Sequence, residues 1–236
     1  MRTLPVLFLA GTLALGCRAA SEPGEPPHAA PRAEAAPTVA EAGWSVLLDA
    51  ASFDGWESID YGGEGAVERV ALPEGGSAVR LGMGSMLTGI RRTDGAALPR
   101  FDYELEVVAA RLAGTDFFCG LTFPVGEAHA TLVLGGWGGA LTGLSCLDGL
   151  DASDNETKSF RRYEKGREYT ARVRVTRERL QAWVDGESVL DVALAGRKLS
   201  LRAEVEKSRP LGISSYATVA RIRSVRLRRL GSGDAP

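Results

Sequence analysis

The sequence is poor in the residues that most often carry nucleophilic or metal chemistry. Its 236 residues include two histidines and three cysteines, and His28 falls in a stretch rich in alanine and proline. His129 is therefore the single histidine of the predicted folded region, which excludes a zinc site built from several histidines. A GxSxG elbow is lacking, as are a GxxxxGK phosphate loop and a GxGxxG turn leading from a strand into a helix. We interpret His129 as a surface or loop histidine, with a catalytic role as the alternative.

Long apolar runs are confined to the start of the chain. Residues 4–15 are apolar, which is too short for a helix that spans a bilayer. A positive residue precedes this run and a small residue followed by Cys17 ends it, as in a bacterial lipoprotein signal. We predict that residues 1–17 are a signal peptide and that Cys17 is lipidated. The protein would then be exported to the cell envelope and held on a membrane by its lipid anchor. Ordinary cleavage near residue 19 or 20, which would give a soluble exported protein, is the alternative.

The segment that follows lacks large apolar residues. Residues 18–42 consist mainly of alanine, proline, glutamate and serine, a composition that cannot bury enough apolar surface to fold. We predict a disordered linker over residues 18–42 and one folded domain over residues 43–230. The last residues, 231–236, are expected to be a disordered tail.

Helical periodicity is nearly absent from the predicted domain. Apolar residues instead recur at every second position, as in Phe101–Ala109 and Ala171–Val175, and turn-forming pairs such as Asp185-Gly186 separate these runs. The pattern predicts an all-β, two-sheet antiparallel jelly-roll sandwich. The inward-facing residues are expected to include Tyr103, Leu105, Val107, Phe117, Leu121, Val173 and Val175. The last strand needs a bulge near Arg223-Ser224 to keep its apolar residues on one face.

No charge sign dominates the chain, whose net charge is −2. This balance argues against nucleic acid as a partner. Arginines do gather in ARVRVTRER and ARIRSVRLRR, where they alternate with aliphatic residues. A solvated sheet face is the favoured interpretation, and a basic ligand-binding face is the alternative.

Cys119 and Cys146 are predicted to be free thiols, because the strand between theirs would keep them too far apart for a disulfide. A bridge between them remains the alternative.

Carboxylates and one tryptophan offer the remaining chemistry. The loop from Asp148 to Glu156 carries several oxygen ligands that could hold calcium, although a solvated polar loop is the favoured interpretation. Trp137 lies among four glycines in GGWGG, where its ring could stack on a sugar or simply fill the core.

Neighbouring strands could bring several of these side chains to one rim of the sandwich. We assign Trp137 as the stacking platform, Asn155 as the residue that binds sugar hydroxyls, and Asp116 or Glu156 as the candidate catalytic base. Glu206 is a weaker candidate for binding substrate in the same groove. The alternative is that these residues solvate separate loops.

Five segments, in this order, resemble the 3-keto-disaccharide hydrolase family, long described as a domain of unknown function. They are WSVLLDAASFDGWE, GSMLTGIRR, PRFDYELEVVAARLAGTDFFCGLTFPV, GREYTARVRVTRERLQAWVDGESVLDV and RPLGISSYATVARIRSVRLRRL. The resemblance implies a concanavalin A-like sandwich of the lectin/glucanase type. For some members it also implies cleavage of glycosides oxidised at C3, in which a base removes the proton at C2. The sequence departs from the family at DFFCG (116–120), where the family has an NSG motif, and at GISSY (212–216), where the family's histidine is missing.

These observations predict a carbohydrate-active protein of the cell envelope, without a resident cofactor. The resemblance favours a hydrolase or lyase that cleaves C3-oxidised glycosides. A non-catalytic glycan-binding sandwich is the main alternative, since the motif residues differ where chemistry would need them. A structural envelope protein without a ligand is the third.

Overall fold

The structure is a computed structural model that describes residues 43–94 and 98–231. The predicted signal peptide with Cys17, the predicted linker and residues 232–236 of the predicted tail lie outside the described residues. Within the described part of the chain, no helix is long and apolar enough to cross a membrane.

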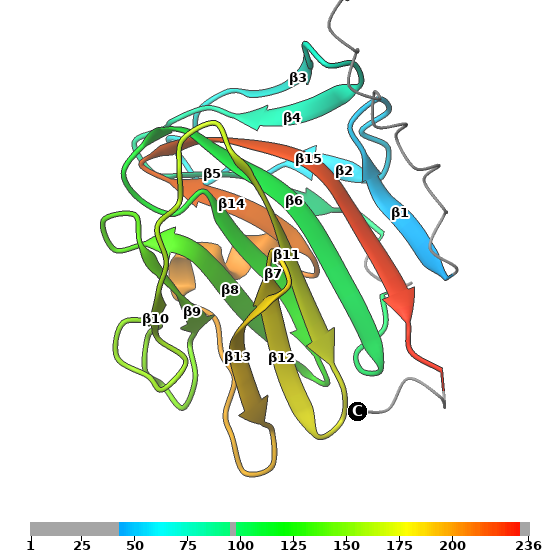
Figure 1. Ribbon diagram of the computed structural model, residues 1–236, viewed down its shortest axis with the longest axis vertical. Coiled ribbons are helices and arrows are strands. Elements are labelled where there is room, and N and C mark those ends of the chain that lie inside the picture. Colours follow the sequence, from blue (N-terminus) through cyan, green and yellow to red (C-terminus); the bar gives the residue numbers. More distant parts are fainter. Residues whose placement is uncertain (1–42, 95–97, 232–236) are drawn as a thin grey trace, which may run out of the picture. The chain divides into compact units, whose positions relative to one another are not determined.

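The described residues form fifteen strands in two sheets, and every paired strand runs antiparallel to its neighbour (Figure 1). The first sheet has the order β13 (Glu187–Ala193), β12 (Arg179–Val184), β11 (Glu168–Val175), β6 (Tyr103–Gly114), β15 (Thr218–Arg229), β4 (Ser77–Leu81), β3 (Val67–Ala71), with β1 (Trp44–Asp49) also paired to β15. The second sheet has the order β10 (Ser159–Phe160), β9 (Leu141–Ser145), β8 (Ala128–Gly136), β7 (Cys119–Val125), β14 (Gly212–Tyr216), β5 (Leu87–Arg92), β2 (Trp56–Ser58). The predicted all-β antiparallel sandwich is confirmed.

The core lies between the two sheets and follows the predicted alternation. Along β11, every second residue is buried, from Tyr169 to Val175. Six of the seven residues predicted to face inward are buried in this core: Tyr103, Leu105, Val107, Leu121, Val173 and Val175. A residue period of two therefore identifies the core face of regular strands.

Phe117 is the exception, and its predicted core position is wrong. The buried ring is that of Phe118, which packs against Tyr163 with ring centroids 5.1 Å apart. Phe117 is half-buried, and a Cβ atom on Gly120 would lie 3.1 Å from its ring. Gly120 faces away from the core, because its neighbours Cys119 and Leu121 face into it. The regular strand begins only at Cys119, so the alternation cannot be extended back to Phe117.

The predicted bulge in the last strand is confirmed. Ile222 pairs with Ala109 and Ser224 pairs with Val108, so Arg223 is the extra residue. Both Ile222 and Val225 remain fully buried as a result. The turn predicted at Asp185-Gly186 is also present and joins β12 to β13 as a hairpin; its residues have positive φ angles of 52° at Asp185 and 81° at Gly186, as a type I′ turn requires.

The arginines of the alternating stretches lie on the outer face of the first sheet. Glu104 accepts hydrogen bonds from Arg174 (2.7 Å) and Arg228 (2.8 Å), and its side chain is only 1% exposed. Arg226 pairs in the same way with Glu106 (2.6 Å). The charge on this face is therefore compensated within the sheet, as expected of a solvated structural face.

The two cysteines of the domain are free, as predicted. Cys119 is buried on β7, and Cys146 directly follows β9. Strand β8 separates β7 from β9 in the second sheet, which explains why the two thiols do not pair.

Candidate functional site

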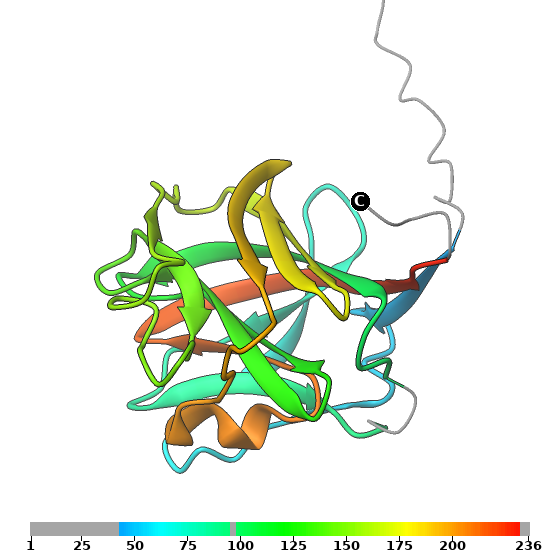
Figure 2. The ribbon, with the colours of Figure 1, turned by 90° about the horizontal axis from the view of Figure 1, so that it is seen from below.

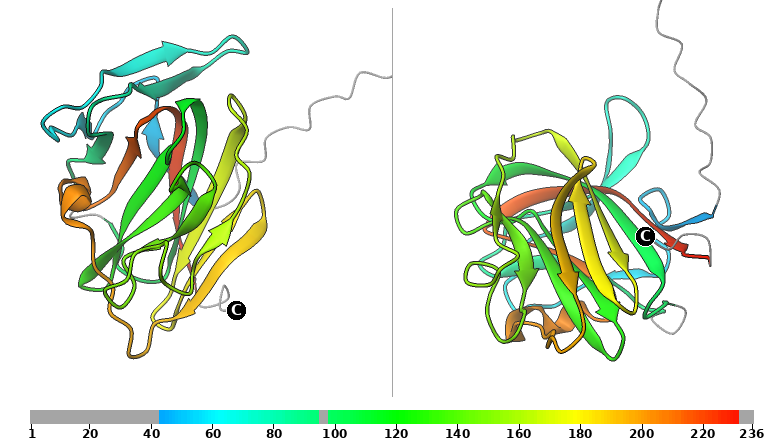
Figure 3. Two further views of the ribbon diagram at one scale, coloured as in Figure 1. Left: turned by 90° about the vertical axis from the view of Figure 1, so that its left-hand side faces the viewer. Right: turned by 60° about the horizontal axis from the view of Figure 1, so that its bottom comes forward.

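A pocket of about 390 Å³ opens on the outer face of the second sheet. Thr131 and Val133 of β8 line it, and both point away from the core because Leu132 between them points into it. One wall comes from the chain around the short helix η2 (Ala203–Ser208), which packs against β14 and β5. Figures 2 and 3 show η2, in orange, on the side of the second sheet away from β11 and β12. The full lining is Met86, Leu87, Asp116, Phe117, Thr131, Val133, Trp137, Ser145, Arg202, Glu204, Val205 and Tyr216.

Trp137 lies at the pocket in a strained backbone conformation. It occupies the first central position of the turn between β8 and β9, with φ of 47°, and Gly138 follows with φ of 86°. The Gly139 N–H donates to the Gly136 carbonyl at 3.1 Å, which closes a type I′ turn. Asparagine or glycine is usual at this position, and a bulky residue there costs about 1–2 kcal/mol. The side chain is 44% exposed, so Trp137 is not a core residue.

Asp116 lies beside this turn and holds it. Its Oδ1 accepts the Phe117 N–H at 2.8 Å, and its Oδ2 accepts the Gly138 N–H at 3.3 Å. The Thr218 hydroxyl in turn donates to the Asp116 carbonyl at 2.9 Å, which ties this segment to β15. Sequence reasoning thus correctly placed Asp116 and Trp137 together, but the carboxylate already binds the turn that carries the tryptophan.

Two further aromatic side chains line the pocket. The rings of Phe117 and Tyr216 are nearly parallel, with an interplanar angle of 28° and centroids 6.1 Å apart. The Tyr216 N–H donates to the Phe117 carbonyl at 3.0 Å, so the two residues are also linked through the backbone. Tyr216 is 43% exposed. The pocket therefore presents three aromatic side chains rather than the single tryptophan expected from the sequence.

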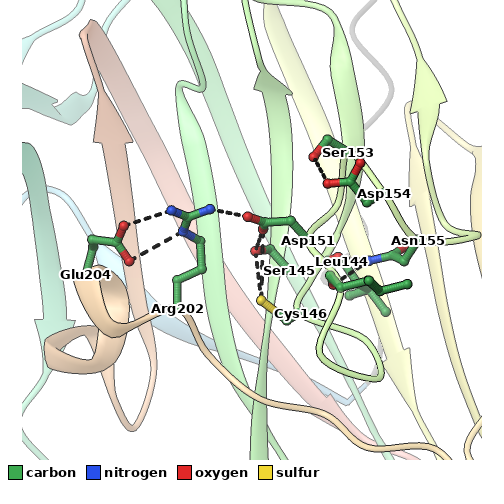
Figure 4. Close-up of polar contacts among 10 residues, drawn as sticks. Leu144, Ser145, Cys146, Asp151, Ser153, Asp154, Asn155, Arg202 and Glu204 are labelled. Atoms are coloured by element: carbon green, nitrogen blue, oxygen red, sulfur yellow. Dashed lines mark hydrogen bonds and ion pairs between the residues drawn. The ribbon is translucent and has the colours of Figure 1, made fainter.

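A polar cluster forms another part of the lining (Figure 4). Arg202 donates to both carboxylate oxygens of Glu204, at 2.8 and 3.4 Å, and also binds Asp151. The Ser145 hydroxyl donates to the same Asp151 carboxylate. Arg202 holds the pKa of Glu204 below its ordinary value, so Glu204 is a charged hydrogen-bond acceptor at neutral pH.

The structure does not bring Asn155 and Glu156 to the pocket. The Asn155 side chain donates to the carbonyls of Leu144 (2.7 Å) and Leu150 (3.1 Å), and its oxygen accepts the Thr157 N–H at 2.9 Å. Figure 4 shows the amide turned toward the backbone of Leu144, away from Arg202. Asn155 is therefore used to hold its own loop, which corrects its predicted placement at the rim.

Glu156 and Glu206 are each held by an arginine. Glu156 accepts from Arg197 at 2.9 Å and is not a lining residue. Glu206 pairs with Arg209 and also lies outside the lining, whereas Glu204, two residues earlier, belongs to it. The acidic segment predicted from the sequence therefore reaches the pocket, but through Glu204 rather than Glu206. An irregular segment has no fixed period, so the sequence does not predict which of its side chains point into a pocket.

The loop predicted as a possible calcium site has other partners for its carboxylates. Asp148 accepts from Arg197 and from the Lys198 N–H, both at 2.7 Å, and Asp151 binds Arg202. Among the described residues, no group of three or more histidine, cysteine, aspartate or glutamate side chains is placed to hold a metal ion. These contacts give the calcium hypothesis no support, and we do not propose a metal here.

His129 lies on β8 and is not among the pocket-lining residues. Burial lowers its pKa to about 4, and the nearby positive charges of Arg209 and Arg100 act in the same direction. Of the two predicted settings, surface or loop, it has neither fully, because it lies near the start of a strand and is half-buried. An imidazole with this pKa is neutral at physiological pH.

The sequence matches no protein-family model and no curated protein. Among solved structures, it is similar to a carbohydrate esterase from Shiga toxin-encoding bacteriophage phi24B, with 16% identity, a TM-score of 0.55, and coverage of 80% of this chain and 100% of that one. It is also similar to the Crh5 transglycosylase in complex with NAG, with 13% identity, a TM-score of 0.53, and coverage of 80% of this chain and 85% of that one. A third similar structure is the Emp47p carbohydrate recognition domain, with 13% identity, a TM-score of 0.51, and coverage of 81% of this chain and 99% of that one. At these identities the likeness shows the fold alone. The lectin/glucanase-type fold implied by the family resemblance is confirmed, while membership of the 3-keto-disaccharide hydrolase family stays a prediction.

Proposed function

We propose that this protein binds a short neutral glycan in the pocket on the second sheet and releases it chemically unaltered. The observation that carries the proposal is Trp137, a half-exposed tryptophan held in a strained turn at the pocket. Strained backbone persists only where the surroundings enforce it, and such strain concentrates at binding and catalytic sites. A tryptophan with a free ring face is suited to the apolar C–H face of a sugar ring.

The rest of the lining fits the same ligand. Phe117 and Tyr216 add aromatic surface, and the hydroxyl of Ser145 and the ion pair of Arg202 with Glu204 add hydrogen-bonding groups for sugar hydroxyls. A pocket with mostly apolar walls and a few fixed polar groups is typical of small-ligand sites. A volume of about 390 Å³ suits one or two sugar rings rather than a long chain.

The charges of the lining favour a neutral sugar over an acidic one. Asp116 and Glu204 are acidic, and the one lining arginine, Arg202, is already bound to Glu204 and to Asp151. A sugar carboxylate would therefore approach two negative charges without an unengaged cation to receive it. We expect uronic acids to bind more weakly than their neutral counterparts.

The similar structures support a carbohydrate ligand. Their descriptions name a carbohydrate esterase, a transglycosylase with bound NAG and a carbohydrate recognition domain. The location proposed from the sequence is compatible with such a role, because a lipid on Cys17 and an extended linker would hold the domain at the surface of a membrane.

Cleavage of C3-oxidised glycosides is the second candidate function, and two carboxylates in the pocket favour it. In that reaction a base removes the C2 proton, a C1=C2 double bond forms as the bond between C1 and the glycosidic oxygen breaks, and that oxygen takes up a proton; water then adds to the double bond to complete the hydrolysis. Asp116 would be the base, as predicted from the sequence. However, both of its oxygens already accept backbone N–H groups, and Glu204 is held in its charged form by Arg202. Binding without turnover therefore has the stronger support.

One experiment with two sets of sugars separates these functions. The full chain is titrated with an array of neutral oligosaccharides and their uronic acid counterparts, and any bound sugar is recovered and analysed by mass spectrometry. In parallel, the protein is incubated with a 3-keto-disaccharide. The proposal predicts retention of a neutral sugar with unchanged mass and no release of a monosaccharide from the 3-keto substrate. Release that disappears in Asp116→Asn would establish the second candidate instead.

A further inference from the structure

A buried arginine lies directly beneath the turn that carries Trp137. Arg111 is on β6 of the first sheet, is only 6% exposed, and reaches across to the second sheet. Its Nη2 donates to the carbonyls of Gly135 (3.1 Å) and Gly139 (2.8 Å), one on each side of the tryptophan. Its guanidinium carbon lies 5.4 Å from the centre of the Phe118 ring. One side chain thus joins the two sheets at this turn.

This contact involves two of the four glycines around Trp137, Gly135 and Gly139. A Cβ atom on Gly135 would lie 2.2 Å from Nη2 of Arg111, and one on Gly139 would lie 2.9 Å from Nη1. At both distances the guanidinium would have to shift to make room for a Cβ atom, so it keeps its present place on the two carbonyls only beside residues without one. Gly138 differs, because no atom lies within 4 Å of its Cβ position.

Burying the charged side chain of Arg111 at this position costs free energy of folding. Burial lowers its pKa, which the negative charge of Asp116 partly offsets, and among the described residues its Nε atom has no hydrogen-bond partner. An apolar side chain of similar size would fill the same space without removing a charge from water. The advantage of the arginine is therefore its two hydrogen bonds to the turn.

We infer that Arg111 is a positioning residue that presents Trp137 to the glycan, an inference that rests on the proposed function. Arg111 fixes the two ends of the strained turn from inside the sandwich, and Asp116 fixes Gly138 from the pocket side. Trp137 lies between these attachments. The ring is thereby ordered before the sugar arrives, so binding does not have to order it.

The test uses Arg111→Met, which keeps the size of the side chain and removes its donors. We expect the affinity for the neutral oligosaccharide that the wild type binds to fall about tenfold, as when a preorganised loop becomes mobile. A second readout is ¹⁹F NMR of protein labelled with 5-fluorotryptophan, in which Trp137→Phe identifies the resonance of Trp137. That resonance should shift and broaden in Arg111→Met, while those of the other three tryptophans stay in place.

Arg92→Met is the matched control. Arg92 also donates to a carbonyl, that of Leu47 at 2.8 Å, and it lies 5.8 Å from the ring of Trp56, but it is outside the pocket. The Arg92→Met variant should shift the resonance of Trp56 and bind the glycan with wild-type affinity. Wild-type affinity, or an unmoved Trp137 resonance, in folded Arg111→Met would overturn the inference and leave the proposed function intact. If the wild type binds no glycan, the proposed function fails, while the NMR readout still decides whether Arg111 orders Trp137.

A second pair of variants covers the case in which Arg111→Met does not fold. Gly138 and Gly139 both have positive φ angles, of 86° and 106°, so alanine strains the backbone at either position. Only Gly139→Ala also meets other atoms, which are Nη1 of Arg111 at 2.9 Å and the Thr115 carbonyl oxygen at 3.0 Å, so where Arg111→Met folds its effect is also compared in that background, in which the guanidinium contact is absent. The inference requires that Gly139→Ala disturbs the Trp137 resonance and weakens glycan binding more than Gly138→Ala does. Equal effects would contradict it.

Discussion

Replacing Trp137 by glycine and by alanine tests whether its turn is strained. Both variants lose the indole ring, so any stability that the ring provides is lost equally. They differ in that alanine keeps a Cβ atom at a φ of 47°, where it costs about 1–2 kcal/mol and glycine does not. Glycine loses about 0.4–1 kcal/mol through the greater freedom of the unfolded chain. The glycine variant should therefore be the more stable by about 1 kcal/mol.

This order is the reverse of the usual one, which makes it easy to recognise. In an ordinary strand, alanine is more stable than glycine by roughly 0.5–1 kcal/mol. Val46 on β1 provides the control, because it is 67% exposed and is not among the residues with positive φ. At Val46 the alanine variant should be the more stable.

Urea denaturation of the four variants gives the free energies directly. At position 137 the difference of about 1 kcal/mol corresponds to a melting temperature about 2–4 °C higher for glycine than for alanine. Both variants should lose glycan affinity to the same extent. If Trp137→Ala is as stable as Trp137→Gly, the turn is not strained, and the argument from strain to function fails.

Three further predictions concern other parts of the chain. Cys17→Ala should release the protein from the membrane fraction, and unchanged partitioning would exclude the lipid anchor. His129 has a pKa of about 4 in the folded state against an ordinary value of 6.5, so between these pH values the unfolded chain binds more protons than the folded chain does. The free energy of unfolding should therefore fall as the pH drops from 6.5 to 4. His129→Gln should make this free energy less dependent on pH over the same range. Glu104→Gln leaves Arg174 and Arg228 without their buried carboxylate and should cost about 3 kcal/mol in urea denaturation, whereas Glu68→Gln, which breaks an exposed ion pair, should cost less than about 1 kcal/mol.

The sequence predicted the fold where the chain is regular. Alternation along β6 and β11 identified the core face, and the mismatch of phase around Arg223 located the bulge. Both follow from the fixed period of two of a strand. At Phe117 the strand has not yet begun, so the period does not apply and the wrong phenylalanine was assigned to the core.

The sequence predicted part of the candidate site, namely the part that lies next to regular strands. Asp116 and Trp137 lie at the ends of neighbouring strands β7 and β8, so sequence order was enough to place them together. Asn155 was misplaced, because its hydrogen bonds within its own loop depend on a loop conformation that composition does not determine. Arg111 was missed because its strand belongs to the other sheet and its role depends on a contact between the sheets. Gly135 and Gly139 allow its close approach, but a glycine in a sequence does not identify the residue that approaches it.

Calorimetric titration of the full chain with the best-retained neutral oligosaccharide, in parallel with Trp137→Ala, measures what the tryptophan contributes to glycan binding in the pocket. Removing a tryptophan at the centre of a contact typically costs about 2 kcal/mol, so the dissociation constant should be about 30-fold higher for the variant. If the wild type binds no neutral oligosaccharide, or if the variant binds it as tightly as the wild type, the pocket is not a neutral-glycan site built on Trp137.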